Sequence, residues 1–202
     1  MKIFRSLISV LAIIIGLYPI IYFVIDRRFG LLSTKSAALL ENIGWNIGFY
    51  VHIIFGGIAL LIGWIQFNPK IRAKYVRLHK IIGKLYLVSV GFSSIAGFYI
   101  AFYATGGIIS TLGFMSLSVI WFYTSLNAYL KIRHAEVDQH KNWMIYSYAA
   151  CFAAVTLRLW LPILTFIFSD FIIGYQIVAW LCWVPNLIVA NLIISRFSEE
   201  RI

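Results

Sequence analysis

The sequence predicts an all-α, polytopic membrane protein with six transmembrane helices. Hydrophobic residues make up 62% and charged residues 12% of the 202 residues, whereas a soluble domain contains about 45–50% apolar residues. Six segments with few or no charges each reach the roughly 20 residues that cross about 30 Å of hydrocarbon. These segments are residues 7–25, 47–67, 78–103, 107–130, 143–166 and 171–195. No hydrophilic stretch is long enough for a soluble domain, so we expect one integral membrane domain over residues 1–202.

The first segment follows Lys2 and Arg5, as the apolar part of a signal peptide would. Its apolar run, residues 7–25, is long enough to cross a membrane, and no small-residue cleavage site separates it from Asp26 and Arg27. We therefore expect a spanning helix that stays in the protein. The next stretch, residues 26–46, is the longest hydrophilic one, and near its end Glu41, Asn42, Trp45 and Asn46 are expected to form an interfacial lid.

The second, third and fifth segments each carry a narrow face of small or polar residues that includes a histidine. Steps of three and four residues return to one side of an α-helix, and Leu, Ile, Val and Phe cover the remaining sides. The three faces are Gly48, His52, Gly56, Ala59, Gly63 and Gln66, then His79, Gly83, Tyr86, Val90, Ser93 and Gly97, then His140, Met144, Ser147, Cys151, Ala154 and Arg158. We expect these histidines to point into a helix bundle and not at lipid. The spacing leaves open whether the faces meet.

The fourth segment, residues 107–130, contains no histidine and follows a short uncharged link. Prolines lie inside or near the ends of the first, fifth and sixth segments, at Pro19, Pro162 and Pro185. Neighbouring helices can satisfy the backbone groups that a proline leaves unpaired in a membrane, so kinks are expected at these positions.

The basic residues predict the orientation of the chain in the membrane. With the N-terminus inside, most Lys and Arg residues fall in inner segments, whereas Arg27, Arg28 and Lys35 fall outside. The positive-inside rule then places both termini in the cytoplasm and the protein in the cell's inner (cytoplasmic) membrane. The net charge of +10 therefore indicates topology and contact with anionic lipid headgroups in the bilayer, and not a nucleic-acid partner.

Two histidines are predicted to lie at the same membrane level. The third and fifth segments run in the same direction and begin near His79 and His140, so both imidazoles are expected near the cytoplasmic face. Two neutral imidazoles at one depth can be the axial ligands of a b-type haem, for which the small residues leave room. The alternative is that small residues simply let helices pack closely.

Two further polar residues are predicted in the outer leaflet. His52 lies roughly 7 Å below the outer surface, and Arg158 lies about 27 Å along its helix from His140. An arginine at the centre of a spanning helix costs about 2.5–3.5 kcal/mol on insertion scales, so Arg158 should face a partner. The candidate partners are Glu41, an anionic ligand and helix-end carbonyls.

A soft-metal site is a weaker alternative to haem. Imidazole, thioether and thiolate suit copper, and His140, Met144 and Cys151 share one face. Cys151 lies about 16 Å along the helix from His140, however, which is too far for one coordination sphere. Cys151 and Cys182 both lie within spanning segments, so a structural disulfide framework is not expected. The sequence contains no phosphate loop, His-Glu-x-x-His motif or nucleophile elbow.

A set of motifs resembles a widespread bacterial and fungal family of predicted membrane proteins of unknown function. The resemblance covers roughly residues 47–196, and its motifs are the run from His52 to Gly63, then Gln66-Phe67, Arg77-Leu78-His79-Lys80, Gly83-Lys84-Leu85-Tyr86, His140 to Met144, and Arg158. It implies kinship and no activity.

A more distant resemblance is to the ascorbate-reducible transmembrane b-type cytochromes, in which helices two to five each carry a haem-ligating histidine. It implies that His79 and His140 hold a cytoplasmic haem b and that His52 matches one half of an outer pair. Because the fourth segment lacks a histidine, the outer site is expected instead to be a pocket for a quinone or another polar substrate. That pocket would contain His52, Arg158, Glu41 and Trp45.

Three functions remain open, and the sequence does not decide whether the protein is an enzyme. The first is a redox protein that transfers electrons between the haem and a quinone-like or small-molecule partner. The second is a non-catalytic assembly or accessory subunit of a respiratory complex, in which the histidines are structural. The third is a transporter of a metal or small solute, which broken helices and inverted repeats would favour. No clear internal repeat is visible in the sequence.

Overall fold

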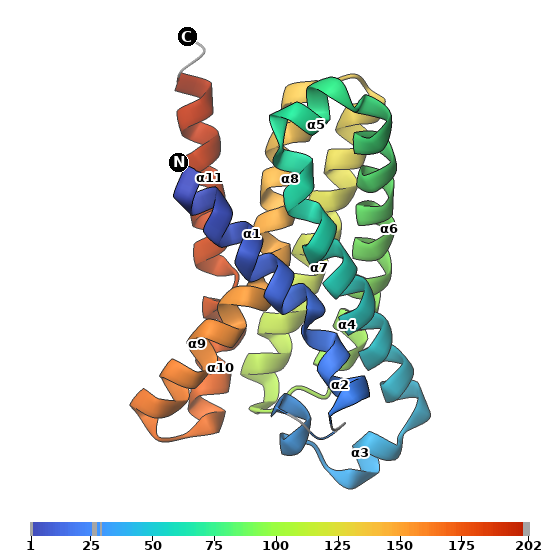
Figure 1. Ribbon diagram of the computed structural model, residues 1–202. Coiled ribbons are helices and arrows are strands. Elements are labelled where there is room, and N and C mark those ends of the chain that lie inside the picture. Colours follow the sequence, from blue (N-terminus) through green and yellow to red (C-terminus); the bar gives the residue numbers. More distant parts are fainter. Residues whose placement is uncertain (1, 26–27, 29, 200–202) are drawn as a thin grey trace. The chain divides into compact units, whose positions relative to one another are not determined.

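The computed structural model describes residues 2–25, 28 and 30–199, and these residues form helices and connections without a β-strand (Figure 1). Six helical segments of this described part are long and apolar enough to cross a membrane, which confirms the predicted fold class. Asp26 and Arg27, expected after the first helix, lie outside the described residues. The chain divides into two compact units, residues 1–105 and 106–202, with three of these segments each. The units are described separately, and the single domain stays a prediction.

The first span of unit 1 consists of three helical pieces, α1 (Lys2–Leu17), the 3₁₀ helix η1 (Tyr18–Ile20) and α2 (Ile21–Val24). Pro19 lies in η1 and has no amide hydrogen, which explains why the regular α-helix is interrupted there. The span packs against α4 (Ile43–Gly63) through two glycines. A Cβ atom on Gly57 would lie 2.7 Å from the carbonyl oxygen of Gly16, so only glycine permits this approach.

The second span begins earlier than predicted, because a side chain caps it. The Oδ1 atom of Asn42 accepts a hydrogen bond from the Trp45 amide at 2.9 Å, so α4 begins at Ile43 and not at residue 47. Trp45 and Asn46 therefore belong to the helix and not to the preceding connection. That connection contains the short helices η2 (Gly30–Thr34) and α3 (Ala37–Glu41).

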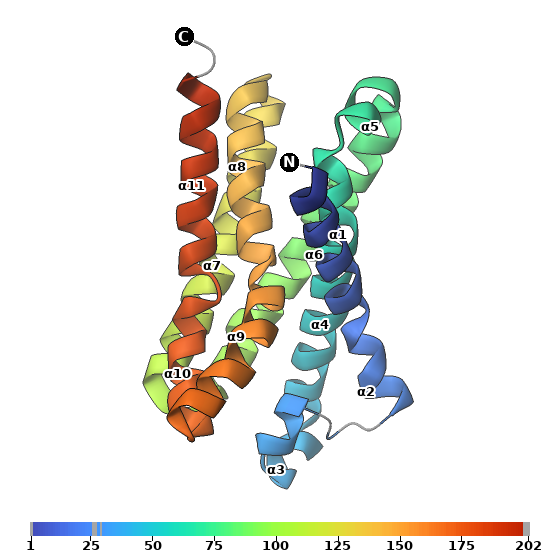
Figure 2. The same cartoon turned by 60° about the vertical axis from the view of Figure 1, so that its left-hand side comes forward.

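The third span, α6 (Val76–Ala101), separates buried and exposed residues as its sequence predicts. Tyr86, Val90 and Ser93 are fully buried at 0% exposure, whereas Phe92 and Ile95 are more than half exposed. Two views show α4 and α6 side by side (Figures 1 and 2), and they pack together extensively. The 3₁₀ helix η3 (Trp64–Phe67) and the short helix α5 (Pro69–Lys74) connect them.

Unit 2 contains the remaining three spans. The fourth is α7 (Gly107–Arg133), which packs on α8 (Val137–Cys151), the first part of the fifth span. The second part is α9 (Ala153–Phe168), and the sixth span consists of α10 (Phe171–Leu181) and α11 (Val184–Glu199). The fifth and sixth spans are thus each interrupted, and Figure 2 shows the change of direction between α8 and α9.

Proline explains only one of these two interruptions. Pro185 lies in the first turn of α11, where its missing amide hydrogen and its ring disfavour a continuous helix from α10. In the fifth span the interruption falls at Phe152, whereas α9 continues through Pro162. The proline in the fifth span therefore does not mark where that helix is interrupted.

Candidate functional site

The structure places the predicted site residues in both units. Glu41, Trp45, His52 and His79 belong to unit 1, whereas His140 and Arg158 belong to unit 2. The predicted pairing of His79 with His140, and of His52 with Arg158, therefore stays a prediction. Within each unit, the neighbouring helices determine what these side chains contact.

His140 lies in the first turn of α8, half-buried, with its ring fixed by the neighbouring helix. Its Nδ1 atom lies 2.7 Å from the carbonyl oxygen of Ala128 in α7. Because a carbonyl oxygen can only accept, Nδ1 carries the hydrogen, and the neutral ring has its lone pair on Nε2. Histidines that bind metals commonly donate their other ring N–H to a backbone carbonyl in this way. His140 is thus prepared to act as a ligand through Nε2.

The polar face that begins at His140 turns toward α7. Met144 is buried, and Ser147 is fully buried with its hydroxyl oxygen 2.6 Å from that of Ser125 in α7. Cys151, one turn further, is also buried. Met144, Ser147 and Cys151 therefore point into unit 2, as the spacing predicts, whereas Ala154 and Arg158 are only half-buried beyond the interruption at Phe152. On the outside of the same helix, Lys141 forms an exposed ion pair with Asp138 at 2.8 Å.

His52 forms a reciprocal connection between α4 and α6. Its Nδ1 atom lies 2.9 Å from the Ser93 carbonyl oxygen, and the Ser93 hydroxyl donates to the His52 carbonyl oxygen at 2.9 Å. The same reasoning places the hydrogen on Nδ1. His52 thus takes part in the interhelical hydrogen bonding that was the structural alternative to a functional role.

The two small-residue faces of unit 1 pack against each other. A Cβ atom on Gly48 would lie 2.8 Å from the Tyr99 ring, and one on Gly56 would lie 3.0 Å from the Ser93 hydroxyl oxygen. Neither position leaves room for a flat macrocycle between α4 and α6. The small residues here serve close helix packing, which was the alternative to the haem interpretation.

His79 has a more open neighbourhood on its helix face. It is half-buried near the start of α6, and Gly83 lies one turn later on the same face. The nearest atom to a Cβ on Gly83 would be the Oε1 of Gln66, at an ordinary contact distance of 3.7 Å. A Cβ atom would thus fit at Gly83 without a clash, unlike at Gly48 and Gly56.

Arg158 has a backbone carbonyl as a partner. Its Nη1 atom donates to the Ala154 carbonyl oxygen at 2.8 Å, within α9 and close to the interruption at Phe152. Ala154 lies in the first turn of α9, so this carbonyl is not one of the unpaired helix-end carbonyls that were expected as partners.

Trp45 and Glu41 differ in exposure. Trp45 is 3% exposed and stacks on Phe49 with ring centroids 5.2 Å apart, in an aromatic cluster with Tyr22. Glu41, the last residue of α3, is exposed. Trp45 therefore helps to build the interior of unit 1.

Lys35 joins the connection after the first span to the end of α6. Its ammonium group donates to the Tyr103 carbonyl oxygen at 2.5 Å and to the Thr105 hydroxyl oxygen at 3.0 Å. A cation at this position interacts favourably with the carbonyl groups that end a helix. Burial lowers the pKa of the Lys35 amine from its ordinary value of 10.5.

Sequence reasoning missed a polar cluster at the interruptions of unit 2. Asn186 Nδ2 donates to the carbonyl oxygens of Cys182 at 2.9 Å and Ala149 at 3.2 Å, and lies 3.2 Å from the Thr156 hydroxyl oxygen. Thr156 itself donates to the Cys182 carbonyl oxygen. One signal was present in the sequence, since Asn186 directly follows Pro185 in an otherwise apolar span.

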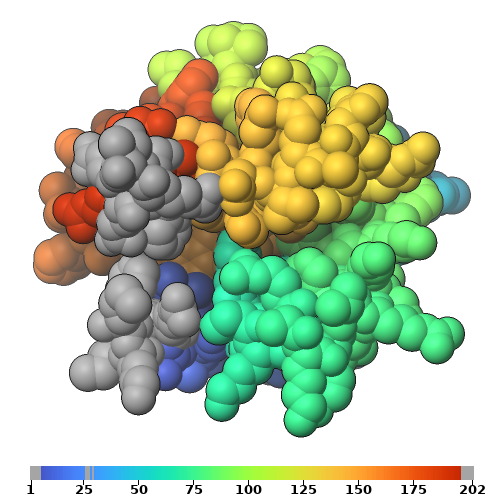
Figure 3. Space-filling model, turned by 90° about the horizontal axis from the view of Figure 1, so that it is seen from above, coloured from blue at the N-terminus to red at the C-terminus, as the bar shows by residue number. Residues whose placement is uncertain are grey.

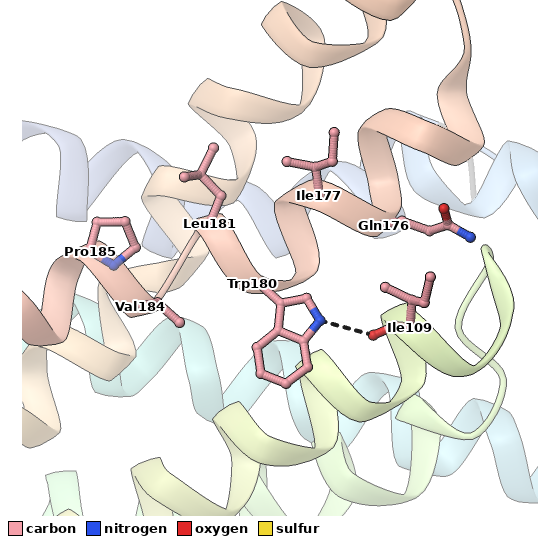
Figure 4. A pocket seen from close by; sticks show the side chains of 7 residues that line it. All are labelled: Ile109, Gln176, Ile177, Trp180, Leu181, Val184 and Pro185. Atoms are coloured by element: carbon pink, nitrogen blue, oxygen red, sulfur yellow. Dashed lines mark hydrogen bonds between the residues drawn. The ribbon is translucent and has the colours of Figure 1, made fainter.

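An apolar groove of about 510 Å³ lies on unit 2 and contains none of the predicted site residues (Figure 4). The Trp180 indole donates to the Ile109 carbonyl oxygen at 3.1 Å, and the Gln176 amide donates to the Gly106 carbonyl oxygen at 2.7 Å. The lining residues are Ile109, Gln176, Ile177, Trp180, Leu181, Val184 and Pro185. Such a lining suits hydrocarbon.

Within residues 2–25, 28 and 30–199, no group of three or more His, Cys, Asp or Glu side chains is arranged to hold a metal ion. A haem with two axial histidines does not need such a group.

The sequence matches the family described as Predicted membrane protein (DUF2306) over residues 49–194. This range contains all four histidines and Arg158, whereas Glu41 and Trp45 lie before it. No curated protein and no solved structure matches the chain.

Proposed function

We propose that this chain, which belongs to the DUF2306 family of predicted membrane proteins, is an integral membrane redox protein that binds one b-type haem. His79 and His140 are the proposed axial ligands. The observation that carries the proposal is the 2.7 Å contact between His140 Nδ1 and the Ala128 carbonyl oxygen, which fixes the tautomer that a ligand needs. When bound, the haem would supply one-electron transfer.

His79 is proposed as the second ligand on two grounds. It begins the third span as His140 begins the fifth, and alternate spans of a membrane chain are expected to run in the same direction. Its helix face is also packed less tightly at Gly83, where a Cβ would meet only an ordinary contact at 3.7 Å. Gly56 was also expected to leave room for the haem. It does not, because the Ser93 side chain fills the space beside it.

The chain's own groups have distinct tasks in this proposal. The hydrogen bond to Ala128 holds the His140 ring in place and makes Nε2 a stronger base. Met144 and Ser147, both buried, keep water from the inner side of that ring. The outer pocket expected at His52, Arg158, Glu41 and Trp45 is not part of this proposal, because Ser93 is hydrogen-bonded to His52 and Trp45 packs against Phe49 in the interior of unit 1.

The proposed location is the inner membrane, with both termini in the cytoplasm, as the distribution of Lys and Arg predicts. Single cysteines placed in the α5 connection and at Ser169, between α9 and α10, test this orientation. A membrane-impermeant thiol reagent added to intact cells should label the second position and not the first. Labelling with the opposite preference would reverse the proposed orientation.

The visible spectrum tests the haem proposal directly. Protein purified in mild detergent, after haem is supplied during expression, should show a Soret band and, with dithionite, sharp α and β bands. His79→Ala and His140→Ala should each abolish these bands, since a bis-histidine haem needs both ligands. His134→Ala is the matched control, because His134 is exposed at the end of α7 and lies outside the proposed site. A colourless, folded wild-type protein would overturn the proposal.

The reciprocal bond between His52 and Ser93 favours a second candidate, a non-catalytic subunit of a respiratory complex. In that function the histidines are structural, and the contacts of His52 with Ser93 and of His140 with Ala128 are interhelical hydrogen bonds. This candidate predicts a colourless protein that co-purifies with a partner from detergent-solubilised membranes.

The interrupted fifth and sixth spans favour a third candidate, a transporter of a metal or small solute. Discontinuous helices near the bilayer midplane are typical of transporter binding sites, where unwound carbonyls bind the cargo. In this chain side-chain donors already bind the Cys182 carbonyl oxygen, which argues against that carbonyl as a cargo ligand. Uptake of labelled Cu⁺ or Zn²⁺ by reconstituted vesicles would test this candidate.

A further inference from the structure

We propose that Gln66 donates a hydrogen bond to a carboxylate or carbonyl oxygen of the ligand that binds beside His79. The inference rests on the proposed function, because it assigns a residue to the same site. Gln66 lies in η3, is 7% exposed, and its Nε2 atom has no hydrogen-bond partner among the described residues. Buried donors are nearly always paired in native proteins, so this amide indicates a partner from outside the protein.

The position of Gln66 connects this donor with the histidine. Its Oε1 atom lies 3.7 Å from the place that a Cβ on Gly83 would take, so the amide lies against the face of α6 that carries Gly83. Gly83 lies four residues after His79, which is about one helical turn on the same face. A ligand bound on this face of α6 would touch the imidazole at one end and the amide at the other.

The end of the second span explains why the amide is held there. Asn68 precedes Pro69, which favours an extended conformation, and its Oδ1 accepts a hydrogen bond from the Lys70 amide at 3.0 Å. The span therefore ends in the 3₁₀ turn η3 and not in a continued α-helix. The Nε1 atom of Trp64, in the same turn, is a second buried donor that lacks a partner within the described part of the chain. Residues two apart in a helical turn do not face each other, so this indole is not assigned to the ligand of Gln66.

The surrounding charge favours an anionic acceptor. The segment from α5 to the first turns of α6 contains six basic residues and no acidic one, and its side chains project outward at this end of unit 1 (Figure 3). A group of like charges raises the local concentration of anions. The basic residues are Lys70, Arg72, Lys74, Arg77, Lys80 and Lys84. A haem propionate therefore matches the site better than a quinone carbonyl, although both present the acceptor oxygen that Gln66 needs.

Gln66→Leu tests the inference, with Gln176→Leu as the matched control. Both glutamines lie within spans, but the Gln176 amide donates to the Gly106 carbonyl oxygen at 2.7 Å and is thus structurally engaged. Haemin is titrated into each purified apoprotein and followed by the Soret band, and a short-chain ubiquinone is titrated separately and followed by tryptophan fluorescence. Gln66→Leu should weaken the binding of one ligand about three- to tenfold, as expected for the loss of one hydrogen bond. Gln176→Leu should bind both ligands like the wild type.

Weaker binding of haemin by Gln66→Leu would assign the acceptor to a propionate, and weaker binding of the quinone would assign it to a quinone carbonyl. Unchanged binding of both ligands would overturn the inference. Stability of the ligand-free protein is a second readout. Gln66→Leu should keep or raise the thermal unfolding midpoint, because it removes an unpaired buried donor, whereas Gln176→Leu should lower it. An equal decrease in both variants would show that Gln66 has a protein partner and would also overturn the inference.

The two proposals fail in different ways. A wild-type protein that binds no haem would refute the haem function while the quinone titration still tests Gln66. A wild-type protein whose haem depends on His79 and His140 but not on Gln66 would keep the function and refute this inference.

Discussion

Asn186 holds the two interrupted spans of unit 2 together, and replacing it with alanine should lower the free energy of unfolding by about 1–2 kcal/mol. Its Nδ2 atom lies 2.9 Å from the Cys182 carbonyl oxygen, and 3.2 Å from both the Ala149 carbonyl oxygen and the Thr156 hydroxyl oxygen. Hydrogen bonds between membrane helices contribute about 0.6 kcal/mol on average and about 1.7 at most. Two amide hydrogens shared among three acceptors therefore give the stated range.

Unfolding by SDS in mixed micelles, followed by tryptophan fluorescence, measures this loss. Asn191→Ala is the matched control, because Asn191 also lies in α11 but is exposed and accepts one hydrogen bond, from the Tyr146 hydroxyl at 2.8 Å. Its loss should cost only about 0.6 kcal/mol. The double variant Asn186→Ala, Thr156→Ala should lose less than the sum of the single variants, since the two residues share a network. Equal losses for Asn186→Ala and Asn191→Ala, together with additivity, would refute the reasoning.

Two further predictions concern unit 1. Gly48→Ala should lower the free energy of unfolding by about 1–3 kcal/mol, because its Cβ would lie 2.8 Å from the Tyr99 ring. Gly91→Ala is the control, because nothing lies within 4 Å of the Cβ that it adds, and it should be neutral or stabilising by up to about 1 kcal/mol. The same SDS titration measures both variants. A larger loss of stability in Gly91→Ala than in Gly48→Ala would contradict the packing at these two positions. Burial lowers the pKa of Lys35 in the folded protein from 10.5. Between that lowered pKa and 10.5, the unfolded chain binds more protons than the folded protein does. The free energy of unfolding should therefore rise with pH in this range. Lys35→Met should remove this rise in unfolding measured from pH 8 to 10.5, and an unchanged slope would contradict it.

The six spans and the direction of the polar faces could be predicted from the sequence because both depend on local properties. Hydrocarbon thickness sets the length of a span, and the helical period places residues three and four apart on one side. Burial of Tyr86, Val90 and Ser93 opposite exposed Ile95 results from that period. The start of the second span was missed by a few residues, because hydropathy does not register the cap at Asn42.

Partners across helices could not be predicted, because spacing along one helix does not encode its rotation against another. The bond between His52 and Ser93 needs both α4 and α6 in register, and each residue alone gave only a position on a face. The interruption of the fifth span at Phe152 has no proline to mark it, whereas that of the sixth span lies next to Pro185. The hydrogen bonds that backbone carbonyl oxygens accept, as at Ala149 and Cys182, likewise cannot be predicted from the residue types.

His52 and His140 share one arrangement, in which Nδ1 donates to a carbonyl oxygen of the neighbouring helix. The arrangement fixes a tautomer, and both a metal ligand and a structural histidine benefit from it. Other contacts must therefore separate the two roles. Ser93 returns a second hydrogen bond to His52 and fills the space beside Gly56, so α4 and α6 are closed around that ring. Looser packing one turn from an imidazole, as at Gly83 after His79, is thus a better guide to a ligand site than the tautomer alone.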